Sequence, residues 1–233
     1  MRPIKGVLPI AIQTKESGFL SLIVPKENAK EAAVVSGLSV YGFDHIKDII
    51  SFLEGHDFPS EKIDLQVEFE KKQYYGLDFS DVKGQQSIKR CMEIAAAGGH
   101  NIILIGPPGA GKTMLAKRLP SILPPMTLHE ALETTKIHSV VGKVKDMGLI
   151  SQRPFRSPHH TISDVALVGG GTFPQPGEIS LSHNGVLFLD ELPGFKRSFI
   201  EVMCQPLENR EVTVSRVARS CEFSLSDRQQ LKG

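Results

Sequence analysis

The sequence predicts an α/β protein in which a mainly parallel sheet is flanked by helices. A short apolar run at 101–105 is followed by a glycine-rich octapeptide, Gly106–Thr113, and then by residues with helical spacing. A second apolar run, Gly185–Leu189, ends in two carboxylates, Asp190 and Glu191. A content of 40% hydrophobic and 23% charged residues is ordinary for a globular chain of 233 residues. Apolar runs that end at polar clusters are typical of parallel strands whose carboxyl ends form a site.

Three stretches can be separated along the chain. Residues 1–55 have α/β character, residues 56–79 form a charged connector, and residues 80–233 form the main domain. The elements expected before the octapeptide are a strand at 19–24, a helix at 27–35, a strand at 38–42, a helix capped by Asp44, and a helix at 86–97 with Ile88, Cys91, Met92 and Ala95 on its buried face.

The octapeptide fits the phosphate-binding pattern G-x-x-x-x-G-K-[ST]. Gly106, Gly109 and Gly111 allow backbone angles and close approaches that a Cβ would block. Lys112 would reach the β- and γ-phosphates of a nucleotide, and the hydroxyl of Thr113 would ligate Mg²⁺. The alternative is a glycine-rich turn with a purely structural role. The strand and helix expected on either side favour a nucleotide site.

The carboxylates after the second apolar run supply what a Mg²⁺–nucleotide site requires on a neighbouring strand. Asp190 would hold Mg²⁺, and Glu191 would orient and deprotonate the attacking water. A buried strand that emerges into a polar turn is the alternative interpretation. The phosphate-binding loop upstream favours the catalytic one.

Composition excludes several other classes. The formal net charge of +1 gives no overall attraction for nucleic acid, so any such binding must use local patches. Cys91, Cys204 and Cys221 are odd in number and lack metal-ligand spacing, which favours a reducing, cytoplasmic location. The sequence contains no apolar run long enough for a membrane span and no signal-peptide core, so we expect no membrane partner.

Six segments together resemble a known family. Val82–Gln85, Gly106–Thr113 and Gly185–Leu192 resemble the core of AAA+ P-loop ATPases. The branch is indicated by Phe155–Thr161, Val168–Gly171 and Pro174–Asn184, which resemble the magnesium-chelatase-like AAA+ ATPases of the competence-associated ComM/YifB type. The resemblance implies ATP and Mg²⁺ as cofactors, a homo-oligomeric ring, and action on DNA.

The resemblance also assigns residues. It implies that Val82 and Gln85 lie near the adenine, that Glu191 and Lys112 are catalytic, and that Thr113 and Asp190 hold Mg²⁺ with the nucleotide. The predicted nucleotide-binding residues are Val82, Gln85, Gly106, Pro107, Pro108, Gly109, Ala110, Gly111, Lys112, Thr113 and Asp190.

An insertion is expected at about residues 155–184, because the octapeptide and the carboxylates are far apart for one helix–loop–strand connection. In the resembling family this insertion projects toward the ring pore, where Arg156, His159 and His160 could contact DNA. Metal binding by the histidine pair is disfavoured, since adjacent residues on an extended chain point opposite ways. Structural hydrogen bonding and nucleic-acid or intersubunit contact both stay open. The glycines that suit a hairpin tip are Gly169, Gly170, Gly171 and Gly177.

Both ends depart from the family pattern. The stretch before residue 55 resembles a fragment of a Lon-protease-like domain, but Leu8 stands where Lon proteases carry their catalytic lysine, so peptidase activity is disfavoured. A helix at 201–208 and a strand at 211–216 that begins a hairpin are expected next. After them we find no polar sensor, arginine finger or lid, and Arg216 and Arg219 do not match the finger position. The sequence therefore predicts a core truncated at both ends, without the C-terminal lid, in which hydrolysis is impaired.

Three functions follow from these observations. The first is an ATP-driven AAA+ ring motor of the competence type acting on DNA. The second is a truncated, hydrolysis-deficient fragment that binds nucleotide. The third is a metal-chelatase motor subunit that drives insertion of Mg²⁺ into a tetrapyrrole.

Overall fold

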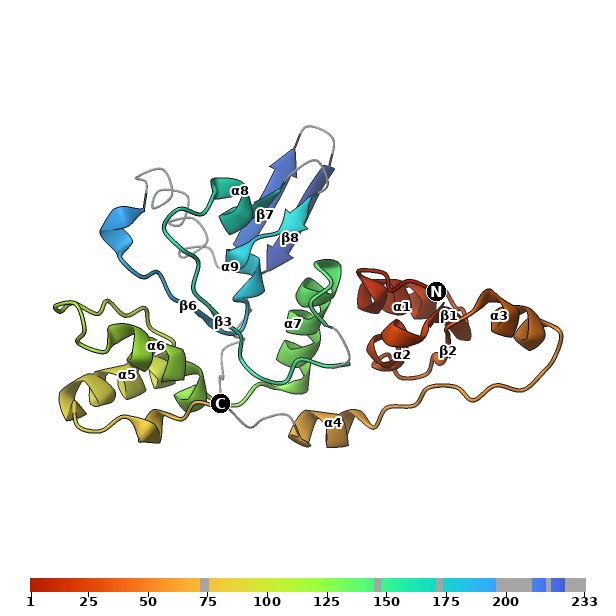
Figure 1. Ribbon diagram of the computed structural model, residues 1–233, viewed down its shortest axis with the longest axis horizontal. Helices are drawn as coiled ribbons and strands as arrows, with labels where there is room; N and C mark the ends of the chain where they lie inside the picture. The colour runs from red at the N-terminus through yellow and green to blue at the C-terminus, as the bar shows by residue number, and fades with distance from the viewer. Residues whose placement is uncertain (72–75, 145–147, 171–173, 196–210, 217–218, 225–233) are drawn as a thin grey trace, which may run out of the picture. The chain divides into compact units, whose positions relative to one another are not determined.

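The structure is a computed structural model that describes residues 1–71, 76–144, 148–170, 174–195, 211–216 and 219–224 (Figure 1). The chain divides into two compact units, each made of two stretches of sequence. The first unit comprises Met1–Lys72 and Leu128–Ser151, and the second comprises Gln73–Thr127 and Gln152–Gly233. The domain boundaries expected from the sequence, at 1–55, 56–79 and 80–233, stay predictions.

The first unit is built around two parallel strands with helices beside them (Figure 1). Ser21 pairs with Ser39 and Pro25 with Phe43, and the intervening helix makes the crossover that a parallel pair requires. The strand–helix–strand order predicted here is confirmed, whereas the first helix was not predicted. The elements are α1 (Val7–Glu16), β1 (Ser21–Pro25), α2 (Lys26–Ala33), β2 (Ser39–Phe43), α3 (Ile46–Leu53), α4 (Leu65–Lys71) and α7 (Leu128–Val140).

Buried polar groups fix the start of α1. The carboxylate of Glu31, which is 7% exposed, accepts a hydrogen bond from Leu8 N at 3.2 Å and another from the hydroxyl of Ser139 on α7. Gly6 N donates to Ser139 O at 2.9 Å. A negative charge at a helix N-terminus is favourable. The core that these bonds surround consists of Val7, Ala11, Val24, Ala29, Ala32, Leu38 and Val40.

The predicted cap of α3 is wrong. His45 occupies the N-cap position without a side-chain hydrogen bond, and the carboxylate of Asp44 instead lies 3.2 Å from Lys26 Nζ. The ion pair competes with capping for the same carboxylate. The apolar face of the helix is present as predicted, but Ile46 and Leu53 are largely exposed.

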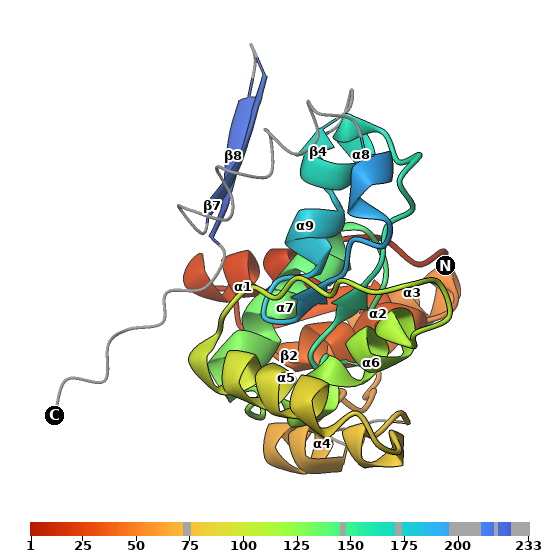
Figure 2. The same ribbon diagram turned by 90° about the vertical axis from the view of Figure 1, so that its left-hand side faces the viewer.

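The second unit consists of short helices and paired strands (Figure 2). Helix α5 confirms the prediction at 86–97, and its residues Met92 and Ala95 are buried as expected, whereas Ile88 and Cys91 are exposed. The elements are η1 (Phe79–Asp81), α5 (Gln86–Gly98), α6 (Lys112–Arg118), η2 (Leu119–Ile122), β3 (Phe155–Arg156), α8 (Asp164–Val168), β4 (Gly169–Gly170), β5 (Gln175–Pro176), α9 (Glu178–Leu181), β6 (Val186–Leu187), η3 (Leu192–Gly194), β7 (Glu211–Arg216) and β8 (Arg219–Ser224).

The strand that leads to the carboxylates pairs with a neighbour that the sequence did not reveal. Strand β6 is parallel to β3, with Phe155 opposite Val186, and Val186 N donates to Pro154 O at 2.8 Å. Gly185 permits this approach, because a Cβ there would lie 2.1 Å from Pro154 O. Among the described residues of the second unit this two-residue pair is the only parallel one, because the other two pairs, β4–β5 and β7–β8, are antiparallel. The mainly parallel sheet expected from the sequence is therefore found only as this small part.

The prediction of a strand at 101–105 is wrong. In the described part of the second unit, no strand hydrogen-bonds to these residues, and Ile103 and Ile105 are 76% and 94% exposed. A buried parallel strand needs hydrogen-bonding neighbours as well as apolar side chains. Ile102 alone packs on the cluster of Met92 and Leu115, so the segment approaches α5 and α6 as an extended connection.

Two hairpins agree with the sequence. Strands β4 and β5 are antiparallel, so the hairpin expected in the insertion is confirmed, although its tip at 171–173 lies outside the described residues. Gly177 lies beyond the hairpin at the start of α9, where a Cβ would be 2.2 Å from Leu167 O. Strands β7 and β8 form the C-terminal hairpin. The helix expected at 201–208 lies outside the described residues.

None of the described helices combines the length and the apolar character that crossing a membrane would demand.

Candidate nucleotide-binding site

The octapeptide forms an exposed turn that leads into α6. Gly109 and Gly111 have left-handed backbone angles, with φ of 78° and 80°, which a side chain would make unfavourable. Gly111 is the N-cap of α6 and accepts a hydrogen bond from Leu115 N at 2.9 Å. Gly106 lies outside the left-handed region, so its predicted conformational role is not needed in this structure.

Lys112 folds its ammonium group back onto the loop. Its Nζ donates to Gly106 O at 2.8 Å and to Pro107 O at 2.9 Å. Both acceptors are neutral carbonyls, so the lysine carries an uncompensated positive charge at the concave side of the turn. An anionic phosphate competes well for such a donor, because a bond between two charged groups is stronger than one to a carbonyl.

Thr113 and Asp190 meet although they lie on different elements. The hydroxyl of Thr113 donates to Asp190 Oδ2 at 2.9 Å, and Glu191 N donates to the other oxygen, Asp190 Oδ1, at 3.1 Å. A hydroxyl and a carboxylate in contact are the oxygen donors that Mg²⁺ uses in nucleotide sites. The two side chains that the sequence predicts as metal ligands are thus within hydrogen-bonding distance of each other.

Glu191 follows Asp190 in a left-handed conformation, with φ of 54° and ψ of 51°. Its carboxylate is 77% exposed and lies with Oε2 3.8 Å from Nδ1 of His160. The apolar residues Leu187 and Leu189 pack on a buried cluster that includes Leu167. The end of the strand is thereby anchored while the glutamate stays accessible to water.

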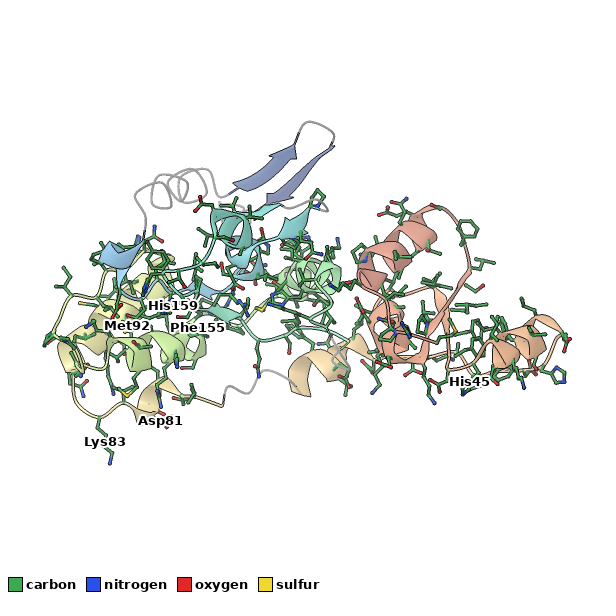
Figure 3. The ribbon with its side chains drawn as sticks, turned by 45° about the horizontal axis from the view of Figure 1, so that its top comes forward. His45, Asp81, Lys83, Met92, Phe155 and His159 are labelled. Carbon is green, nitrogen blue, oxygen red and sulfur yellow. The ribbon has the colours of Figure 1, made fainter. Side chains whose placement is uncertain are left out.

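The segment with Val82 and Gln85 lies against the same loop. Val82 is buried with Phe79, and Gln85, at a φ of 54°, donates from Nε2 to Ala110 O at 3.3 Å. Asp78 caps the short helix η1, and the hydrogen bonds from Ser80 hold the pKa of Asp78 below its ordinary value. The exposed Lys83 extends away from the ribbon (Figure 3). The segment therefore approaches the turn from the side of α5.

The polar residues of the insertion have individual partners. Arg156 makes a bidentate pair with Glu178, at 2.5 Å from Nε and 2.6 Å from Nη2, so its charge is neutralised within the unit. Nδ1 of His159 lies at hydrogen-bonding distance, 2.9 Å, from Thr161 Oγ1. No group of three or more potential ligands (His, Cys, Asp or Glu) that could hold a metal occurs among the described residues.

Sequence reasoning missed the contact of His160 with Glu191. No spacing rule connects a turn residue to a carboxylate more than twenty positions downstream. Only a weak signal was available in the sequence, namely that His160 is one of the polar residues of the insertion named as possible contacts.

A sequence model of the family described as magnesium chelatase, subunit ChlI, matches residues 78–229, more than half of the chain. The chain belongs to this magnesium-chelatase-like family. It is 46% identical to the competence protein ComM of Haemophilus influenzae over 96% of this chain and 44% of that protein. It is 44% identical to the YifB protein of Escherichia coli over 93% of this chain and 42% of that protein. These relatives confirm the ComM/YifB type.

The chain spans less than half the length of these curated relatives. A weaker similarity, 28% identity over 145 residues, links it to Lon protease 2 of Bacillus subtilis, of which it covers 26%. Among solved structures, NtrX from Brucella abortus in complex with ADP aligns at 18% identity over 94% of this chain and 44% of that chain. Its TM-score of 0.42 is too low to establish a common fold.

Proposed function

We propose that this chain binds ATP with Mg²⁺ through an AAA+ type site made by the 106–113 loop and the end of β6. The observation that supports it most is the 2.9 Å hydrogen bond between Asp190 and Thr113, the residue that directly follows Lys112. The loop's amide groups and Lys112 would hold the phosphates, and Thr113 with Asp190 would hold the metal. Val82 and Gln85 would contact the base.

Glu191 is proposed as the general base. Its carboxylate is exposed and adjacent to the metal-holding Asp190, so it can take a proton from a water molecule placed in line with the phosphate. The Mg²⁺ ion, when bound, would neutralise charge on the phosphate oxygens. The residues of the chain would supply the orientation of the water and of the phosphates.

Lys112→Ala tests the binding proposal. We expect the dissociation constant for Mg²⁺–ATP to rise at least tenfold, about 1.4 kcal/mol, because the only charged group that the loop offers the phosphates is lost. Isothermal titration calorimetry of the two proteins measures it. Lys117→Ala, an exposed lysine of the same helix, is the matched control and should bind like the wild type. Equal affinity of the wild type and Lys112→Ala would contradict the proposal.

We further propose that this chain takes part in an ATP-driven ring motor acting on DNA, as the resemblance implies for full-length members of the family, in a cytoplasmic setting. Support comes from the family resemblance and from the similarity to a protein named for competence. The neutralised pair of Arg156 and Glu178 argues against Arg156 as a DNA contact. DNA contact would therefore use other residues of the insertion or of neighbouring subunits.

Phosphate release tests the hydrolytic and DNA proposals together. The sequence predicts that release by this chain is slow, and we expect Glu191→Gln to reduce it by about a further hundredfold or more, since the base is lost while the shape is kept. The assay is run with and without branched DNA, and a reaction without protein serves as the blank. Release that is equal in the wild type and in Glu191→Gln would exclude this site as its source. Insensitivity to DNA would favour the alternative of a nucleotide-binding fragment that does no work on DNA.

A metal-chelatase subunit is the second candidate, favoured by the description of the matching family. Its chemistry would use the same ATP site to drive insertion of Mg²⁺ into a tetrapyrrole. The greater similarity to ComM and YifB over nearly the whole chain supports the competence type instead.

A further inference from the structure

The backbone of Glu191 fixes the direction in which its carboxylate leaves the chain. A left-handed conformation is uncommon for a residue with a Cβ, and here it is held by Gly194 N, which donates to Glu191 O at 2.7 Å. The side chain beyond the Cβ is 77% exposed and free to rotate in water. A catalytic base in that situation needs a neighbour to restrict its rotamers.

His160 is the neighbour that faces it. Its Nδ1 lies 3.8 Å from Glu191 Oε2, which is an ion-pair distance and slightly too long for a hydrogen bond. A small rotation of the glutamate would close the gap. The imidazole is 33% exposed, so it is itself partly immobilised.

The ring of His160 is held by packing on both sides. It meets the buried Phe195 edge to face, with centroids 6.4 Å apart and planes at 82°, and it lies against His159 at 4.1 Å. Gly194 lies next to the ring, since a Cβ added there would be 3.4 Å from His160 Cγ. These neighbours restrict the imidazole whose Nδ1 faces the carboxylate of Glu191.

The two histidines have different partners. His159 uses Nδ1 for Thr161, within its own turn, whereas His160 directs Nδ1 toward the proposed base. Both belong to the segment that follows β3, the strand paired with β6. Movement of that segment would displace the imidazole from the glutamate.

We propose that His160 is a positioning residue for Glu191, orienting the carboxylate that takes the proton from water. The inference rests on the proposed function, because it gives a role to a neighbour of the proposed base. The proton passes from water to Glu191, and His160 does not accept it. Because His160 lies in the first turn of the insertion, a movement of that turn would change the rate of hydrolysis. Nucleotide binding by the loop would stay the same.

A spectroscopic experiment tests the contact without relying on turnover. Long-range ¹H–¹⁵N correlations of the histidine rings are recorded in the wild type and in Glu191→Gln. The Nδ1 signal of His160 should shift, because the neighbouring charge is removed. His129, whose Nδ1 lies at the same 3.8 Å from Glu133, is the internal control and should not move. An unchanged His160 signal would overturn the proposal.

Kinetics test the role. In single-turnover hydrolysis, His160→Ala should slow the chemical step about tenfold, because part of the general-base contribution depends on orientation. The dissociation constant for Mg²⁺–ATP should stay within about twofold of the wild type, since no loop residue is changed. His160→Gln, which keeps a polar atom facing the carboxylate, should recover part of the rate. His129→Ala removes an equivalent ion pair elsewhere and should leave the rate unchanged.

The outcomes separate this inference from the proposed function. If Lys112→Ala binds Mg²⁺–ATP as the wild type does, the nucleotide site itself is wrong. If Lys112→Ala weakens binding, but His160→Ala leaves the rate unchanged and Glu191→Gln leaves the His160 ring signal unchanged, only the positioning role is wrong. If His160→Ala weakens binding as much as it slows hydrolysis, the residue supports the fold of the site and the proposal is overturned.

Discussion

At the scale of single residues, the site depends on side chains whose proximity few local sequence patterns predict. Thr113 begins the helix after the loop, and Asp190 ends a strand from the other stretch of the second unit, yet a 2.9 Å hydrogen bond joins them. The two side chains would hold Mg²⁺ together with a bound nucleotide, and the ion would supply positive charge next to the phosphates.

Thr113→Val tests this link. Valine keeps the shape of threonine but has no hydroxyl, so the part of ATP affinity that depends on Mg²⁺ should fall about tenfold, or 1.4 kcal/mol. Titrations of ATP with Mg²⁺ and with a chelator measure that part by difference. Thr113→Ser retains the oxygen and should behave as the wild type. A valine variant with full Mg²⁺ dependence would remove Thr113 from the metal site.

At the scale of elements, the pairing of β3 with β6 determines where the carboxylates lie. The approach is close because Gly185 has no side chain, and Val186 N bonds directly to Pro154 O. Residues after Gly185 then run past Arg156, where Phe188 N donates to Arg156 O at 2.8 Å. The position of Asp190 is thus set by a two-strand contact five residues earlier.

Gly185→Ala should therefore damage both stability and the site. The new methyl group would lie 2.1 Å from Pro154 O, so the backbone must move, at a cost of about 1–3 kcal/mol. Urea unfolding should show that loss, and calorimetry should show weaker Mg²⁺–ATP binding. Gly76→Ala is the matched control in the same unit, since nothing lies within 4 Å of its Cβ position. Equal stability of the two variants would contradict the importance of this contact.

The elements show what the sequence could and could not predict. The octapeptide turn, α5, the crossover in the first unit and both hairpins follow from local patterns of glycine and apolar spacing. The pairing of β3 with β6 does not follow from such patterns, because β3 is only two residues long and no apolar run marks it. The strand expected at 101–105 was wrong for the related reason that apolar residues do not specify a hydrogen-bonding neighbour.

The candidate site, too, was predictable from local patterns only in part. Lys112, Thr113 and Asp190 were predicted from motifs, and the structure brings all three to one end of the second unit. The contact between His160 and Glu191 could not be predicted, because it joins a turn to a strand end through tertiary packing.

At the scale of the whole molecule, the stretches that make up the two units alternate along the sequence. The loop comes from Gln73–Thr127 and the carboxylates from Gln152–Gly233, while the stretch between them, Leu128–Ser151, belongs to the first unit. That stretch contributes α7, whose Ser139 shares the buried carboxylate of Glu31. Stability of the first unit and nucleotide affinity of the second should therefore respond to different substitutions.

Glu31→Ala tests that separation. The substitution removes an acceptor of Leu8 N, of the Ser139 hydroxyl and of Asn28 Nδ2. Leu8 N and Asn28 Nδ2 keep a second acceptor, so we expect a total loss of stability of about 1–3 kcal/mol, mainly from the buried Ser139 hydroxyl. Hydrogen exchange should show faster exchange for the amides of α1, α2 and α7. The affinity for Mg²⁺–ATP should stay within about twofold of the wild type.

The control is Glu16→Ala, an exposed glutamate at the end of α1, which should leave both measurements unchanged, because surface substitutions of this kind shift stability by only about 0.5 kcal/mol. Glu31 and the residues of the candidate site belong to different units, so we expect any loss of nucleotide affinity in Glu31→Ala to arise through the fold. A drop in affinity that matches the drop in stability would mean that the two units unfold as one, and the separation argued from their contacts would be wrong.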